Sequence, residues 1–179
     1  MRLPTMHTQR LVIRQFEPLD WHPVSVYTAD PAVMAYIPEG LFTTSQAQAF
    51  VTQQLGDQAN AYAVILLSTQ QLIGHILFHP WFAQQTYEVG WVFNKDYHRQ
   101  GYATEAAGAL LRYGFEELQL HRIIATCQPE NTPSYRVMEK LGMRREGWFK
   151  KCIYRGADYW WDELFYALLA EEWPPAPQN

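Results

Sequence analysis

The chain has little cysteine: only Cys127 and Cys152 occur, and neither belongs to a Cys-x-x-Cys pair or a Cys/His cluster. This spacing excludes a disulfide framework and the usual zinc ligand sets, so we expect no metal site and a reducing compartment. Excess positive charge is also missing, with 14 Lys and Arg against 18 Asp and Glu. This balance predicts that nucleic acid is not the main ligand.

Long hydrophobic runs are absent as well. A helix that spans a bilayer needs about 20 apolar residues, and the apolar runs of this chain, such as AYAVILL at residues 61–67, are much shorter. The opening stretch, MRLPTMHTQRLVIRQF, contains no apolar core of a signal peptide. We therefore expect a cytoplasmic protein that does not bind membranes.

What the chain does contain is a composition typical of a packed domain. Of its 179 residues, 48% are hydrophobic and 15% are aromatic, and no internal repeat is visible. This length and composition predict a single domain, which we place at residues 1–173. The segment 174–179, PPAPQN, should be a disordered proline-rich tail, because proline disrupts both helices and strand ladders.

Apolar periodicity changes along the chain and predicts both strands and helices. Strands are expected at residues 10–16, 61–67, 72–79, 86–93, 122–127, 144–154 and 161–169. Helices are expected from a cap at Asp20 to about Thr28, from Ser45 to about Gly56, after Gly101 to about Leu118, and from Asn131 to about Leu141. This order predicts an α+β fold: a single mixed, mostly antiparallel sheet with helices on both faces.

Residues 94–106, NKDYHRQGYATEA, form a basic and aromatic loop that runs directly into a helix. A helix N-terminus carries unpaired N–H groups and partial positive charge. Gly101 would let a phosphate approach the backbone, while Arg99 could add charge and Thr104 a hydroxyl donor. By itself, however, the loop also fits a plain turn, because it matches neither a Walker A loop nor Gly-x-Gly-x-x-Gly.

A second segment, NTPSYRVMEKLGM at residues 131–143, has a similar double interpretation. Asn131 as a helix cap, Pro133 in the first turn and Gly142 as a C-terminal stop account for it structurally.

Taken together, the segments resemble the GNAT superfamily of acyl-CoA-dependent N-acetyltransferases. The resemblance covers nearly the whole chain and is closest to the subgroup that includes ribosomal-protein N-terminal acetyltransferases. The segments that carry it, in the order of the family, are TQRLVIRQFEPLD, YEVGWVFNKDYHRQGYATEA, NTPSYRVMEKLGM and WWDELFYALLAEEW. It implies acetyl-CoA as cosubstrate and an amine as acceptor, either a protein N-terminus or a small amine.

The resemblance also implies which residues bind the coenzyme. The central strand should splay from its neighbour, so that the pantetheine arm pairs with Trp91, Val92 and Phe93. The residues whose amides should hold the pyrophosphate are Arg99, Gln100, Gly101, Tyr102, Ala103 and Thr104. Asn131 should hold the pantetheine or an ordered water.

Two positions depart from the family pattern. His98 stands where Gln or Arg is usual, which puts one side-chain contact in doubt. Met138 stands where many members carry the tyrosine that protonates the leaving thiolate, and a thioether cannot donate a proton. The subgroup suggests Ser134 instead, about one turn after Asn131 on the same helix face. Tyr135 points about 100° away and is expected to pack against the sheet.

A catalytic base is also required, because an amine with a pKa near 10 is protonated at neutral pH and cannot attack a thioester. Glu88, three residues before Trp91, is the expected base; a salt-bridged or solvated strand residue is the alternative. His75 and His79 on the preceding strand could serve instead, or could be structural.

The aromatic residues Trp81 and Phe82, with the stretch 154–161, could line the acceptor pocket or belong to the core. Two rival functions stay open: a CoA-binding module without catalysis, for which Met138 argues, and a scaffold that binds no nucleotide. The sequence leaves the oligomeric state open, a homodimer included.

Overall fold

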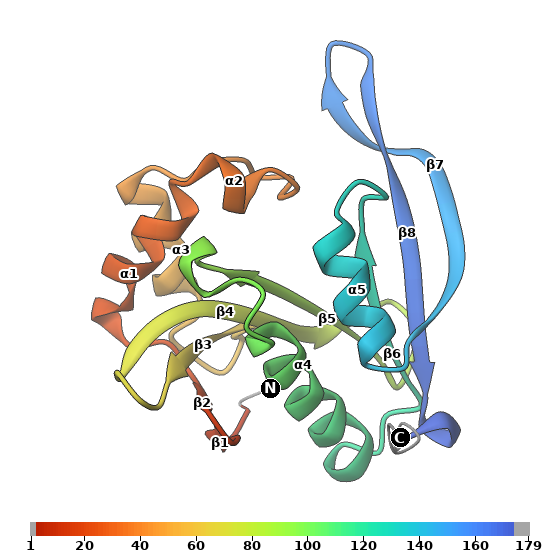
Figure 1. The fold of residues 1–179 in the computed structure, drawn as a ribbon, viewed down its shortest axis with the longest axis horizontal. Coiled ribbons are helices and arrows are strands. Elements are labelled where there is room, and N and C mark those ends of the chain that lie inside the picture. Colours follow the sequence, from red (N-terminus) through yellow and green to blue (C-terminus); the bar gives the residue numbers. More distant parts are fainter. Residues whose placement is uncertain (1–2, 174–179) are drawn as a thin grey trace.

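The computed structural model describes residues 3–173, so the proline-rich segment 174–179 lies outside the described residues. An eight-stranded sheet has the strand order β1-β2-β3-β4-β5-β6-β8-β7 (Figure 1). Its strands are β1 (Met6–His7), β2 (Leu11–Arg14), β3 (Ala61–Leu66), β4 (Gln71–Pro80), β5 (Thr86–Phe93), β6 (Arg122–Cys127), β7 (Arg144–Gly156) and β8 (Tyr159–Leu169). All neighbours pair antiparallel except β5 and β6, so the predicted mixed, mostly antiparallel sheet is confirmed.

Helices cover both faces of this sheet. The α-helices are α1 (Trp21–Thr28), α2 (Pro31–Met34), α3 (Thr44–Gln53), α4 (Tyr102–Arg112) and α5 (Thr132–Lys140). A π-helical turn at Tyr113–Glu117 extends α4, and short 3-10 turns lie at Pro18–Asp20, Lys95–Tyr97 and Ala170–Glu172. No helix between residues 3 and 173 is long and apolar enough to cross a membrane.

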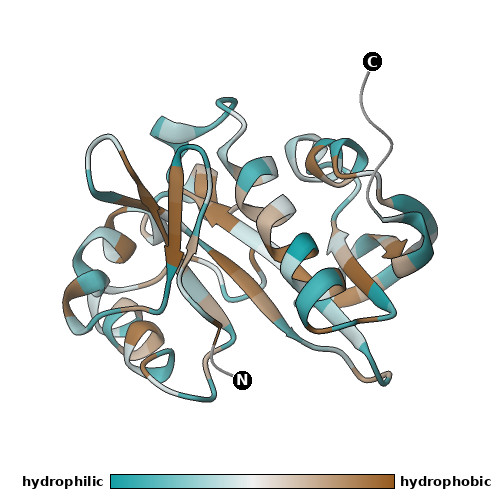
Figure 2. Ribbon diagram, turned by 90° about the horizontal axis from the view of Figure 1, so that it is seen from below, coloured by the Kyte–Doolittle hydropathy of each residue, from teal (hydrophilic) through white to brown (hydrophobic). Residues whose placement is uncertain are grey.

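Each face of the sheet has its own hydrophobic core. The first core packs α4 and α5 on the sheet, and the helix α4 contributes Ala106, Ala107, Leu110 and Leu111 at the three- and four-residue spacing of one helix face. The second core packs α1 and α3 on the opposite face, through side chains such as Val24 and Val51. The central strands are predominantly hydrophobic (Figure 2), as expected for strands buried on both sides.

Two predicted helix starts differ from the structure in detail. The helix expected from Ser45 begins at Thr44 and is capped by Thr43. The Thr43 hydroxyl accepts from the Gln46 amide at 3.3 Å, and the Gln46 side chain accepts from the Thr43 amide at 2.8 Å. This is a capping box, and the Thr-x-x-Gln spacing of the sequence selects it. Asp20 does not cap α1 with its side chain, because that carboxylate accepts hydrogen bonds from Arg14 instead, at 2.6 Å.

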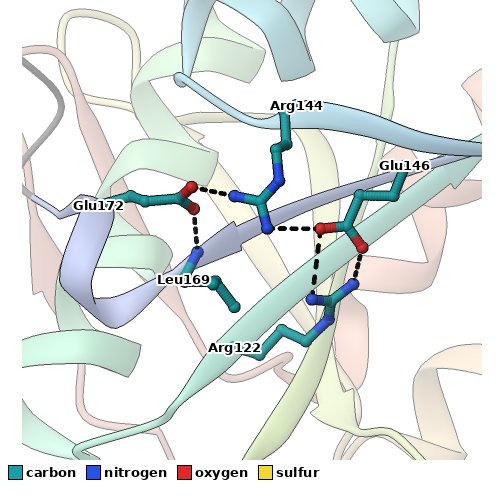
Figure 3. Close-up of polar contacts among 5 residues, drawn as sticks. All are labelled: Arg122, Arg144, Glu146, Leu169 and Glu172. Carbon is teal, nitrogen blue, oxygen red and sulfur yellow. Dashed lines mark hydrogen bonds and ion pairs between the residues drawn. The ribbon is translucent and has the colours of Figure 1, made fainter.

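The strands β7 and β8 form a long hairpin that extends beyond the rest of the molecule (Figure 1). Its base is held by a charged network in which Arg122 of β6 and Arg144 of β7 both bind Glu146 (Figure 3). Arg144 also binds Glu172, whose other oxygen accepts from the Leu169 amide at 2.8 Å. Glu172 therefore anchors the end of the sheet as well as facing solvent.

Candidate active site

The central strand β5 loses its neighbour halfway along its length. Toward β4 it is paired up to Phe93, whereas toward β6 it is paired only over Thr86–Glu88. Beyond Glu88 the strands diverge, because β6 continues its pairing with β8 alone. This is the splay that the family resemblance implies, and it leaves an open edge on β5.

Along β5 the backbone N–H and C=O groups of successive residues point alternately toward β4 and toward the open edge. The Asn94 amide donates to the Ile73 carbonyl of β4 at 2.9 Å, so every second residue before it, including Val92, also faces β4. The Val92 carbonyl does lie against β4, since a Cβ atom added at Gly74 would be 2.5 Å from it. Trp91 and Phe93 therefore direct their backbone groups into the opening, and Val92 does not.

His98, the residue that departs from the family pattern, has a clear structural role. Its Nε2 donates to the Phe93 carbonyl at 2.9 Å and thereby fastens the loop to the end of β5. Three backbone groups at the open edge are then left to hydrogen-bond a ligand: the Trp91 N–H, the Trp91 C=O and the Phe93 N–H.

The loop before α4 presents a series of unpaired amides. Glu105 donates the first hydrogen bond of the helix, to the Gly101 carbonyl at 3.0 Å, so Tyr102 to Thr104 have no acceptor within α4. Within the part of the chain that the structure describes, residues 99–101 donate no backbone hydrogen bond either. Gly101 has a φ of +81°, in the left-handed region that glycine adopts without strain, and Arg99 has a φ of +59°. Consecutive unpaired amides at the positive end of a helix are suited to a phosphate group.

A network behind the loop holds it in place. The Arg10 guanidinium contacts Glu105 at 2.6 Å, donates to the Gln100 carbonyl at 2.9 Å, and lies 4.5 Å from the centre of the Tyr102 ring. The second Glu105 oxygen accepts from the Thr8 hydroxyl at 2.6 Å and from the Arg10 amide at 2.8 Å. Sequence reasoning missed this network, since nothing in TQRL indicates a partner on a distant helix.

A cavity of about 610 Å³ adjoins the open edge of β5. Much of its wall is apolar or aromatic, with Met34, Ile37, Phe42, Phe50, Leu77, Trp91 and Met138 among the lining residues. Its charged residues are Glu39, Glu88 and Glu163, and its described lining contains no lysine or arginine. The cavity therefore favours a cationic ligand over an anionic one.

Glu88 and Glu163 meet at one end of this cavity. Thr126 donates to Glu88 at 3.3 Å, and the Nε2 of His79 lies 4.0 Å from the other Glu88 oxygen. Burial raises the pKa of Glu88, an effect that His79 and Thr126 partly offset. Burial also raises the pKa of Glu163, which shares Thr126 with Glu88. A hydroxyl has one proton, so Thr126 can donate to only one of the two carboxylates at a time.

Sequence reasoning missed Glu163, although a weak signal was present. Within WWDELF of β8 it is an acidic residue that precedes a buried apolar run. Only the pairing of β8 with β6 brings it beside Thr126 and Glu88.

Helix α5 contributes Asn131 and Ser134 to the same cavity. The Asn131 side-chain oxygen accepts from the Ser134 amide at 3.3 Å, so the predicted cap is confirmed and the Asn131 NH₂ group is left for another partner. Cys127 lies beside Ser134, and burial raises the pKa of its thiol to about 12. Met138 lies one turn further along and is 1% exposed. Tyr135 packs against the main core, as expected from its helical phase.

The two histidines of β4 have different environments. His75 is buried, and burial lowers its pKa to about 3. At physiological pH its ring is neutral, but burial so disfavours the protonated form that it is a weak proton acceptor, which argues against one of the alternatives to Glu88. His79 lies beside Glu88.

A second hollow, of about 790 Å³, shares Glu88, Thr126 and Glu163 with the first. Trp81 and Phe82 line it. The aromatic stretch 154–161 lines neither cavity, because it lies at the far end of the β7–β8 hairpin (Figure 1). Nor is it part of the core, since Tyr154, Tyr159 and Trp160 are exposed.

Comparison with known proteins agrees with this geometry. Residues 10–144 match the family described as "Acetyltransferase (GNAT) domain". The chain is 61% identical over 166 residues to YnaD of Bacillus subtilis (strain 168), named an uncharacterized N-acetyltransferase, with 93% of this chain and 97% of YnaD covered.

Solved structures have the same fold. A crystal structure of a GNAT-family acetyltransferase from Bacillus anthracis superposes with a TM-score of 0.90 at 57% identity, covering 94% of this chain and all of that one. A Vibrio cholerae protein provisionally named a ribosomal-protein-serine acetyltransferase has a TM-score of 0.75 at 23% identity, with 93% and 97% covered. The splayed strand, the open amides and these similarities show that the chain belongs to the GNAT family of N-acetyltransferases.

Proposed function

We propose that the protein transfers an acetyl group from acetyl-CoA to a primary amine, on a protein N-terminus or a small molecule, by direct attack within a ternary complex. The observation that carries this proposal is the continuity of the site. The open edge of β5 leads from the loop at Gly101 to the cavity that Glu88 and Ser134 line.

The residues fit the coenzyme. The unpaired amides of residues 99–104 are suited to its diphosphate, and Gly101 has no Cβ atom to obstruct the approach. Trp91 and Phe93 could pair with the amides of the pantetheine arm, as an added strand would. The free NH₂ group of Asn131 would bind a pantetheine oxygen or an ordered water. The backbone of Val92 would not pair with the pantetheine arm, because its N–H and C=O groups face β4.

Bound acetyl-CoA supplies an acyl group already activated as a thioester. Glu88 would accept the proton that the amine must lose, and its raised pKa makes it a better base than an ordinary carboxylate. As the nitrogen–carbon bond forms and the carbon–sulfur bond breaks, the Ser134 hydroxyl would donate to the departing sulfur. Backbone N–H groups at the open edge would polarise the thioester carbonyl.

The charge of the cavity supports an amine as acceptor. Glu39, Glu88 and Glu163 attract an ammonium ion, and the absence of lysine and arginine from the described lining disfavours acidic acceptors. Cys127 is unsuited to an acetyl-cysteine intermediate, because a thiol with a pKa of about 12 is almost wholly protonated at neutral pH.

The test is a turnover screen with acetyl-CoA over small amines and peptides with varied first residues, with release of free thiol as the readout. We expect thiol release with at least one acceptor class. Coenzyme binding in calorimetry without release for any amine would favour a catalytically silent CoA-binding module, consistent with Met138. If acetyl-CoA did not raise the melting temperature of the protein, a scaffold that binds no nucleotide would be favoured.

A further inference from the structure

His75 is a buried polar residue that the proposed chemistry does not use. It is 5% exposed, yet it lines the cavity of about 610 Å³ beside the open edge of β5. Its ring lies between the rings of Phe16, Tyr27 and Phe50, with centroid distances of 6.4, 5.8 and 5.0 Å. A polar ring held in an aromatic wall needs an explanation, because burial of an unpaired polar group is unfavourable.

One ring nitrogen of His75 has a partner. Its Nδ1 lies 2.7 Å from the hydroxyl of Tyr27, a residue of α1 that is 1% exposed. Within residues 3–173 the Tyr27 hydroxyl has no other hydrogen-bond partner, so its proton stays paired only if it donates to Nδ1. The other nitrogen, Nε2, must then carry the ring proton, because the imidazole is neutral.

The Nε2–H of His75 is therefore a donor without a partner among the described residues. Burial keeps the ring neutral, with a pKa of about 3, so this donor does not change with pH in the physiological range. His75 lines the cavity, so an acceptor atom of a ligand bound there could reach this donor, whereas the rings of Phe16 and Phe50 offer none.

We propose that His75 is a specificity-determining residue, whose Nε2–H donates to an uncharged carbonyl or hydroxyl oxygen at the far end of the acceptor substrate. This inference rests on the proposed function, because it assumes that the acceptor amine reaches Glu88 through this cavity. Tyr27 is the positioning residue that selects the tautomer.

The strand geometry gives the length of such an acceptor. His75 and His79 lie four residues apart on β4, and His79 is the register partner of Glu88. At about 3.3 Å per residue, the two ends of the site lie roughly 13 Å apart. Leu77 lies on the same strand face between them and Phe50 lines the wall, so the intervening part of the acceptor should be apolar. The substrate class is a primary amine with an apolar spacer and a neutral terminal oxygen.

The first test uses pairs of primary amines of equal length, with and without a terminal amide or hydroxyl. We expect the wild-type enzyme to prefer the oxygen-bearing member at least tenfold in kcat/KM, mainly through KM. His75→Phe keeps an aromatic ring and should abolish the preference without changing the KM for acetyl-CoA. His75→Gln restores an N–H donor and should recover part of it.

Phe50→Leu is the matched control, because it changes the same wall without removing a polar group. It should affect both members of each amine pair equally. Thermal denaturation identifies any variant that fails to fold. In that case Tyr27→Phe is used instead; it removes the hydroxyl that bonds Nδ1 of His75, so the ring proton can lie on either nitrogen and the preference for the oxygen-bearing amine should fall.

The second test does not depend on turnover. ¹⁵N NMR of the imidazole should show the neutral Nε2–H form of His75 from about pH 5 to pH 8, and a tautomer mixture in Tyr27→Phe. An Nδ1–H tautomer in the wild type, or an unchanged preference in His75→Phe, would overturn the inference. Absence of thiol release from the wild type with every amine would instead reject the proposed function.

Discussion

The Nε of Arg10 lies 2.6 Å from a carboxylate oxygen of Glu105, and this contact joins the start of β2 to the first turn of α4. The two residues are 95 positions apart in the chain. Because Arg10 also binds the Gln100 carbonyl, the pair holds the whole loop that precedes α4. The amides proposed to bind the coenzyme are therefore preorganised by the protein.

The first prediction is that Glu105→Gln weakens both coenzyme binding and stability. The variant loses charge-assisted hydrogen bonds from Thr8 and Arg10, so the free energy of unfolding should fall by about 1–2 kcal/mol. The Kd for acetyl-CoA should rise several-fold in calorimetry. Glu139→Gln removes an exposed ion pair with Arg136 and should cost less than about 0.5 kcal/mol. If Glu105→Gln and Glu139→Gln lowered the free energy of unfolding equally, Glu105 would not be holding the loop before α4 in place.

The same contact predicts a dependence on pH. Burial tends to raise the pKa of Glu105, but hydrogen bonds from Thr8 and Arg10 outweigh it and lower the pKa below its ordinary value of 4.5. A carboxylate whose pKa is lowered by folding contributes stability above its unfolded pKa and loses it as the pH falls through the folded value. The stability difference between wild type and Glu105→Gln should therefore be fully present above pH 4.5 and shrink as the pH falls below that value and through the lowered pKa of the folded state.

A second prediction concerns Gly101. Gly101→Ala forces an L-residue to a φ of +81°, which costs about 1–2 kcal/mol, and places its Cβ 3.4 Å from the Arg10 guanidinium. The Kd for acetyl-CoA should rise tenfold or more in calorimetry. Gly156→Ala imposes the same type of strain, at a φ of +93°, in the hairpin away from the site. Loss of stability in both variants, with coenzyme affinity lost in Gly101→Ala alone, is the expected pattern.

A third prediction is that Glu88→Gln lowers kcat by about 100-fold or more, with the Kd for acetyl-CoA unchanged. In the wild type, kcat/KM should fall on the acid side at a pH above the ordinary carboxylate value of 4.5, because burial raises the pKa of Glu88. The variant should lack this acid limb. A wild-type activity in Glu88→Gln would exclude the residue as the base.

Stability should respond to Glu88 in the opposite sense to Glu105. A carboxylate whose pKa is raised by folding stabilises the fold in its protonated form, and this contribution is lost as the pH rises through the folded pKa. Urea denaturation at pH 7 should therefore find Glu88→Gln at least as stable as the wild type. A clear loss of stability would mean that the Glu88 carboxylate is a structural group.

A fourth prediction separates Ser134 from its neighbour Cys127. Ser134→Ala should lower kcat at least tenfold, because the leaving sulfur loses its donor, while coenzyme affinity is maintained. Cys127→Ala should retain most of the activity, since its thiol stays protonated with a pKa of about 12. Iodoacetamide at pH 7 should modify the exposed Cys152 and leave the buried Cys127 intact, as peptide mass spectrometry would show.

Much of the fold follows from local patterns. The apolar runs at residues 61–67 and 72–79 and the three-to-four spacing after Gly101 predicted elements that the structure confirms. Elements too short to show a period were missed, namely β1 and α2. The start of α3 differs by one residue from the expected Ser45, because several neighbouring hydroxyl residues could cap a helix and only the reciprocal bonds between Thr43 and Gln46 select one of them.

The sequence by itself determined most of the elements, the need for a glycine at position 101 and the family, because each depends on residues that are close together in the chain. Only the tertiary structure decided which distant groups meet. The Glu88–Thr126–Glu163 cluster requires β5, β6 and β8 to be neighbours, in an order that differs from the chain order. The Tyr27–His75 pair likewise requires α1 to pack on β4 in one register. Such contacts depend on strand order and packing, which local hydrophobic patterns do not specify.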